Sequence, residues 1–238
     1  MKPALTIFLI IVAKATVFQA FAADPSIKPL APGVKLTTND LSAIQIAASN
    51  NLASFRRHIT PSNYRLMGFD STNEALSATT GQPLLCFTIG LRELTNFVVG
   101  SDVNSLLDPP PEPLVLVPIL VGTNVKSSMS LRLVKGGAGS QWVRGDWGQS
   151  KVVRNLTSAL ARIPSAEFDP GSIPFAIEVP VPRTWFVGYY SKQKKLVLVS
   201  TIDLRLKSIP IRRYEVVPLA AINEIANAAR RYDPNLPN

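Results

Sequence analysis

The chain has 238 residues, of which 25 are lysine or arginine and 16 are aspartate or glutamate, so its net charge is +9 at pH 7. It has one cysteine, Cys86, which excludes an internal disulfide, and one histidine, His58. These two side chains cannot supply the set of nitrogen and sulfur ligands that a zinc site needs. We therefore expect a fold stabilised by apolar burial, with no metal site and no cofactor.

The first 22 residues have the pattern of a secretory signal peptide. Lys2 provides a charged head, residues 4–13 are apolar apart from one threonine, and residues 20–22 read Ala-Phe-Ala, the small-residue spacing that a signal peptidase cleaves. A spanning helix needs about 20 apolar residues, and Lys14 interrupts this run. We expect cleavage next to Ala23 and a periplasmic or secreted mature protein without a membrane-spanning segment. Its net charge is +7, because cleavage removes two lysines and no acids.

A Pro-rich leader is expected over residues 23–37, since proline disfavours the interiors of helices and strands. From Thr38 onward, apolar residues recur every three or four positions, which predicts an amphipathic helix that ends before Pro61. The apolar stripe consists of Leu41, Ile44, Ala48, Leu52 and Phe55. Ser71 and Glu74 have the spacing of a capping box and predict a second, short helix.

Several segments between residues 83 and 144 are predicted to be strands. Residues 83–89 form an apolar run typical of a buried strand, whereas residues 91–99 fit a helix or a strand equally well. Four prolines in residues 108–113 predict a polyproline connector, interpreted as a spacer rather than a docking motif.

Residues 114–121 predict a buried strand with an edge or a bulge at Pro118. Residues 125–134 then alternate between apolar and polar, which predicts one strand face in the core and one in water. With a return strand at residues 141–144 after a Gly-rich turn, these segments predict an antiparallel meander.

The second half repeats the order of helix, strands and helix. A helix is expected to begin near Ser150 and end at Pro164, followed by extended segments at residues 175–179, 185–190 and 195–206. In the middle segment Trp185, Val187 and Tyr189 share one face, which we expect to meet the neighbouring helix. Pro218 begins a last helix with Arg230 and Arg231 at its C-terminus, where positive charge is favourable.

This order of elements predicts an α+β fold with antiparallel, meander-like sheets and packed helices. We expect two similar lobes: a helix-plus-sheet lobe at residues 38–163 and a sheet-plus-helix lobe at residues 164–238. A single domain over residues 38–238 is the alternative.

Cys86, as a nucleophile, and His58, as its base, form the sharpest enzyme hypothesis that the sequence offers. The apolar neighbours of Cys86 would bury the thiol and raise its pKa, and His58 stands at the exposed end of the first helix, beside two arginines. We therefore expect a core cysteine and a helix-terminal histidine. An exported hydrolase that uses both residues is kept as an alternative.

Basic residues concentrate in the C-terminal third, close to aromatic ones. The residues expected to form a ligand or partner surface are Lys192, Lys194, Lys195, Arg205, Lys207, Arg212, Arg213, Trp185 and Tyr190. Outside the cytoplasm a positive surface meets anionic lipids, anionic polymers or acidic proteins rather than nucleic acid. We hypothesise an exported, non-catalytic envelope protein that binds a partner protein or an anionic envelope ligand. A lipid-carrying periplasmic protein is a further alternative.

Overall fold

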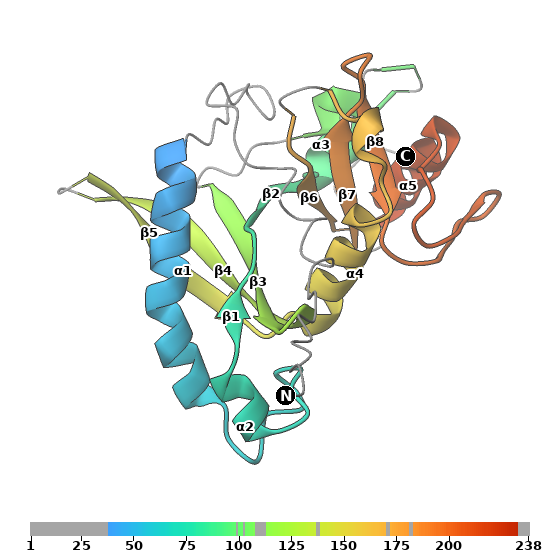
Figure 1. The fold of residues 1–238 in the computed structure, drawn as a ribbon. Coiled ribbons are helices and arrows are strands. Elements are labelled where there is room, and N and C mark those ends of the chain that lie inside the picture. The colour runs from blue at the N-terminus through green and yellow to red at the C-terminus, as the bar shows by residue number, and fades with distance from the viewer. Residues whose placement is uncertain are drawn as a thin grey trace, which may run out of the picture.

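The computed structural model has an α+β fold built on one mixed, mostly antiparallel sheet (Figure 1). It describes residues 38–98, 100–101, 103–107, 113–136, 139–169, 172–180 and 183–232. The predicted signal peptide, the predicted Pro-rich leader and residues 108–112 of the predicted polyproline connector lie outside these ranges, as does the tip of the predicted Gly-rich turn.

Eight strands form the large sheet, in the order β5-β4-β3-β2-β6-β7-β8, with β1 paired beside β3. Their bounds are β1 Thr79–Thr80, β2 Leu84–Thr88, β3 Leu114–Val121, β4 Asn124–Gly136, β5 Gly139–Trp147, β6 Phe175–Val179, β7 Thr184–Tyr190 and β8 Leu196–Ser200. The meander β3-β4-β5 is antiparallel, as expected. A parallel pair, β2 with β6, joins strands from both expected lobes into the same sheet.

The helices cover both faces of this sheet. Their bounds are α1 Thr38–His58, α2 Thr72–Leu76, α3 Leu91–Thr95, α4 Ser150–Leu160 and α5 Leu219–Tyr232, with short 3-10 turns at Val103–Leu106 and Ser165–Glu167. One apolar cluster contains the buried stripes of α1, α3 and α5, and the other contains that of α4. In Figure 1, α1 and α5 lie at opposite ends of the sheet.

The alternation of side chains along a strand explains why β2 contributes residues to both apolar clusters. In β2, Leu85 and Phe87 belong to the cluster with α1, whereas Leu84 and Cys86 belong to the cluster with α4. Successive side chains of a strand point to opposite faces, so a strand covered by helices on both sides is apolar throughout. The continuous apolar run in the sequence is therefore the signature of a central strand.

The predicted helices have close counterparts in the structure. The stripe of α1 is confirmed at Ile44, Ala48, Leu52 and Phe55, all of which are buried. Ser71 caps α2 by accepting a hydrogen bond from the Glu74 N–H at 3.1 Å, but the Glu74 carboxylate accepts from the N–H of Asp70 instead of closing the capping box on Ser71. The segment that fitted either helix or strand forms α3.

Pro118 marks a change of partner within β3. On one side β3 pairs with β4 throughout, with a register shift just after Pro118; on the other it pairs first with β2 and then with β1. The carbonyl oxygen of Pro118 accepts a hydrogen bond from the Gly81 N–H at 2.7 Å. Because proline has no N–H to donate, it is tolerated where the ladder is interrupted.

The polar face of β4 differs from the expectation of a solvated face. Ser128 and Ser130 are buried, because α4 packs across this part of β4. The Ser130 hydroxyl oxygen accepts a hydrogen bond from the Asp146 N–H at 2.7 Å. Only beyond α4, at Arg132 and Val134, is this face exposed.

The expected long strand at residues 195–206 is also interrupted. The strand β8 ends at Ser200, whose hydroxyl donates to the Ile202 carbonyl at 2.6 Å and stabilises a turn. The chain then forms β9, Leu204–Arg205, which pairs with β10, Pro210–Ile211, in a separate small sheet. This turn directs the segment after β8 away from the large sheet.

Candidate ligand-binding groove

The basic residues expected to form one surface are divided between distant places. Lys192, Lys194 and Lys195 are exposed in the turn between β7 and β8. The turn is closed by two backbone hydrogen bonds, from Ser191 N–H to Lys195 O at 2.9 Å and from Lys194 N–H to Ser191 O at 2.7 Å. Since β7 and β8 are antiparallel, this turn lies at the far end of the hairpin from Thr184 and Ser200.

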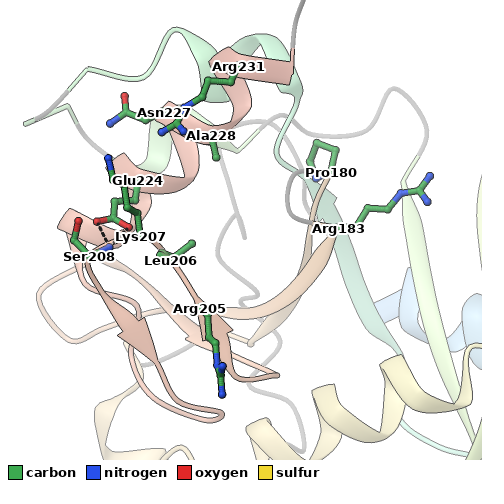
Figure 2. A pocket seen from close by; sticks show the side chains of 10 residues that line it. All are labelled: Pro180, Arg183, Arg205, Leu206, Lys207, Ser208, Glu224, Asn227, Ala228 and Arg231. Carbon is green, nitrogen blue, oxygen red and sulfur yellow. Dashed lines mark hydrogen bonds between the residues drawn. The ribbon is translucent and has the colours of Figure 1, made fainter.

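An open groove of about 770 Å³ lies at that other end. It is lined by Pro180 after β6, by Arg183 before β7, by the segment that includes β9, and by α5 (Figure 2). Its basic residues are Arg183, Arg205, Lys207 and Arg231; its apolar residues are Pro180, Leu206 and Ala228; and Ser208, Glu224 and Asn227 complete the lining. Two residues predicted from the sequence, Arg205 and Lys207, therefore lie here.

A hydrogen-bonded contact between Ser208 and Glu224 shapes one side of the groove. The Ser208 N–H donates to both carboxylate oxygens of Glu224, at 3.0 and 3.1 Å, as the dashed line in Figure 2 marks. Hydrogen bonds from Ser208 lower the pKa of Glu224, with a smaller contribution from the charge of Lys207. The carboxylate is therefore ionised at neutral pH and fixes the segment after β9 against α5.

Arg230, near the C-terminus of α5, holds this helix against α3. The guanidinium of Arg230 donates to the carbonyl oxygens of Thr95 at 2.8 Å and Phe97 at 2.5 Å, just after the C-terminus of α3. Carbonyl groups at a helix end lack intrahelical donors, so this arginine stabilises the end of α3 while it holds α5. The next residue, Arg231, is exposed and lines the groove.

The four basic side chains of the groove carry charge that the described part of the chain does not neutralise by ion pairing. Within those residues, ion pairs join Arg92 to Glu93 and Lys126 to Asp70 and Glu74, and none involves the groove. Figure 2 shows the guanidinium groups of Arg183 and Arg205 pointing outward and away from α5, so the charges are spread around the rim. The groove thus has a positive rim with one acidic side chain, Glu224.

Arg212 and Arg213 do not line the groove. They belong to a turn in which the Arg213 N–H donates to Asp203 at 2.8 Å and the Arg212 N–H donates to Glu215 at 3.0 Å. The Arg213 guanidinium lies 5.8 Å from the ring centre of Tyr214. Tyr214 packs against the apolar cluster on the α4 face, so this turn belongs to that side of the sheet.

The two aromatic residues of the expected surface are half-buried. Tyr190 packs against the α1–α5 cluster, with its ring centre 6.0 Å from that of Phe175. Trp185 packs against the α4 cluster together with Val187 and Tyr189, which confirms that this face of β7 meets a neighbouring helix. Both side chains therefore contribute mainly to packing.

Cys86 and His58 do not come together. Cys86 is buried in the α4 cluster, its thiol donates to the Leu84 carbonyl at 3.5 Å, and burial raises its pKa well above the ordinary value. His58 is exposed at the end of α1, where its Nδ1 lies 2.9 Å from the Ser54 carbonyl oxygen and its ring packs edge-on against Trp147. The stripe of α1 packs on the opposite face of the sheet from Cys86.

No helix of the described ranges combines the length and the hydropathy that crossing a bilayer requires. Likewise, no three histidine, cysteine, aspartate or glutamate side chains of those ranges gather closely enough to hold a metal ion.

Sequence reasoning missed Arg183, Arg231 and Glu224 as groove residues. Arg183 is isolated in the sequence, and the Arg230–Arg231 pair, although it belongs to the basic C-terminal third, is already explained by its place at a helix C-terminus. A signal was present in α5, where Glu224, Ala228 and Arg231 recur at helical spacing on one side of the helix.

Comparison of this chain with protein-family models, with curated proteins and with solved structures finds no match.

Proposed function

We propose that this protein is an exported, non-catalytic binding protein of the cell envelope that holds an anionic ligand in the groove beside α5. The observation that carries the proposal is the set of four basic side chains, Arg183, Arg205, Lys207 and Arg231, around one hollow of about 770 Å³. Hollows of this size are typical of small-molecule sites, which span about 300–1,000 Å³.

The electrostatics of the groove support an anion. The rim has a positive potential, and an anion bound there forms charge-assisted hydrogen bonds with the basic side chains that it meets. The arginines suit phosphate and carboxylate groups especially well, because their planar donors match the geometry of these groups. An acidic protein segment is the competing ligand of the same charge.

The alternative of an exported hydrolase receives no support from its two residues. A cysteine nucleophile acts as a thiolate, and the buried thiol of Cys86 has a raised pKa. A histidine base must lie within hydrogen-bond reach of its nucleophile, whereas His58 contacts Ser54 and Trp147 at the end of α1.

Two charge-matched variants test the binding proposal. One carries Arg183→Gln, Arg205→Gln and Lys207→Gln in the groove; the other carries Lys192→Gln, Lys194→Gln and Lys195→Gln in the hairpin turn. NMR titration of the mature protein with glycerol 3-phosphate at low salt is expected to show saturable binding that the groove variant weakens by at least about tenfold. Equal losses in both variants would show a diffuse charge effect rather than a site.

Export is tested separately by sequencing the N-terminus of the protein recovered from its native cells. We expect the mature chain to begin at Ala23 and to fractionate with the envelope or the medium. A chain that begins at Met1 among cytosolic proteins would contradict this part of the proposal.

A further inference from the structure

The floor and the rim of the groove differ in chemistry. Pro180, Leu206 and Ala228 are half-buried and line the hollow, and Leu206 also packs against the large apolar cluster of the protein. The four basic residues of the rim, by contrast, are all exposed. Their methylene stems add apolar surface below each charged group, as long basic side chains commonly do.

The placement of the charges argues against a small, isolated anion as the preferred ligand. A single phosphate is held best when several donors converge on one point. In Figure 2 the guanidinium groups of Arg183 and Arg205 point to different sides and away from Arg231. A small anion would therefore meet one or two of these charges at a time and would leave the apolar floor exposed to water.

We propose that the ligand of this groove is an anionic amphiphile: a single-chain lipid whose phosphate or carboxylate head lies at the basic rim and whose hydrocarbon lies on the floor of Pro180, Leu206 and Ala228. This inference rests on the proposed anion-binding function and specifies its ligand class. The groove is open and of limited volume, so it accommodates one such molecule rather than a patch of membrane.

The apolar contact supplies a measurable part of the affinity. Each methylene group removed from water strengthens binding by about fourfold. The burial of a few methylene groups on the floor therefore contributes more to the affinity than one exposed charge pair does. Affinity is therefore expected to rise with the length of the hydrocarbon chain until the floor is covered, and then to level off.

Three probes separate the contributions in binding experiments on the mature protein. Lauroyl lysophosphatidic acid, kept below its micelle-forming concentration, carries both head and tail; glycerol 3-phosphate carries the head alone; and lauroyl lysophosphatidylcholine carries the tail with a zwitterionic head. We expect the first to bind at least about a hundredfold more tightly than the second. It should bind at least about tenfold more tightly than the third.

Variants of the floor and the rim test separately the apolar and the charged contributions to binding. Leu206→Ser is expected to weaken lysophosphatidic acid about tenfold and to leave glycerol 3-phosphate unchanged, whereas Arg183→Gln weakens both. Ala228→Gln, which adds a polar side chain to the floor from within a helix, repeats the floor test if Leu206→Ser does not fold. Circular dichroism establishes the folded state of each variant.

The outcomes distinguish this inference from the function on which it rests. If glycerol 3-phosphate binds in the groove as tightly as lysophosphatidic acid, the floor contributes nothing and the amphiphile is excluded, while the anion site stands. If the zwitterionic probe binds as tightly as the anionic one, and Arg183→Gln weakens neither, the charged rim has no role and both proposals fail.

Discussion

Ser208 and Glu224, sixteen residues apart, meet through two hydrogen bonds from one backbone N–H to the two oxygens of one carboxylate. This contact joins the segment after β9 to α5 and so builds one wall of the basic groove. It also places the single acidic side chain of the lining close to the positive rim. Glu224 thus supports the groove structurally and opposes an anion electrostatically.

The substitution Glu224→Gln is therefore expected to strengthen anion binding. It removes one negative charge from the lining and keeps a carbonyl oxygen as acceptor for the Ser208 N–H. Because solvent screens the exposed carboxylate, we expect only a modest gain, roughly twofold to fivefold in affinity for glycerol 3-phosphate. NMR titration measures it, and a loss of affinity would instead show that the carboxylate's fixed geometry matters more than its charge.

The ion pairs of Lys126 predict the pH dependence of stability. The Lys126 Nζ lies 2.5 Å from Asp70 and 2.8 Å from Glu74. Its hydrogen bond lowers the pKa of Asp70, so this stabilisation is present above the unfolded carboxyl pKa of about 3.9 and is lost as pH falls through the lower folded pKa. The two carboxylates raise the pKa of Lys126. The stabilisation from its positive charge is therefore present below the unfolded lysine pKa of about 10 and is lost as pH rises through the higher folded pKa.

Urea unfolding of the wild type and of Lys126→Met tests this dependence. The difference in unfolding free energy between the two proteins is expected to shrink as pH falls from about 5 toward 2. Lys192→Met, in the exposed hairpin turn, serves as the control and should show little difference from the wild type at any of these pH values. If the difference in unfolding free energy between the wild type and Lys126→Met is as large at about pH 2 as at neutral pH, the ion pairs of Lys126 do not cause it.

Cys86 is expected to resist modification in the folded protein. Its thiol is buried and its pKa is raised, so iodoacetamide at neutral pH should leave it unmodified until the chain is unfolded. Cys86→Ala should lower the unfolding free energy by about 1–2 kcal/mol and leave anion binding unchanged. Mass spectrometry after native and denaturing alkylation measures the first effect, and rapid native labelling would return the cysteine to consideration as a reactive group.

Gly188 allows the packing between β6 and β7 to be tested. A Cβ added at Gly188 would lie 2.6 Å from Phe175 and 2.7 Å from Ile177, both of them buried, so Gly188→Ala should destabilise the protein by about 1–3 kcal/mol. Gly122→Ala is the control: no atom lies within 4 Å of its added Cβ, and only its positive φ of 58° opposes the change. That control should cost about 1 kcal/mol. A urea midpoint for Gly188→Ala as high as that of the wild type would contradict the tight packing at Gly188.

Much of the fold could be predicted because local pattern and burial agree. The α1 stripe and the β3-β4-β5 meander follow from periods of three to four and of two residues. The buried serines of β4 could not be predicted, because their burial depends on α4, which comes later in the chain. The end of β8 at Ser200 was hidden for a similar reason, since apolar alternation continues through the turn that follows.

The groove was only partly predictable. The cluster of positive charge in the C-terminal third includes Arg205 and Lys207, which line the groove, but sequence proximity also groups them with the hairpin lysines at the other end of β7 and β8. Three separate segments contribute the lining, and the contacts of Arg230 with α3 and of Glu224 with Ser208 decide how these segments meet. Such contacts between distant segments leave no periodic signal in a single sequence.

The proposed position of the anion beside α5 is tested most directly by the backbone amide shifts of residues 23–238. On addition of glycerol 3-phosphate at low salt, we expect the largest saturable shifts at Lys207, Ser208 and Ala228, with little change at residues 191–195. Shifts that are largest in the hairpin turn, or that are spread evenly over all exposed basic residues, would contradict it.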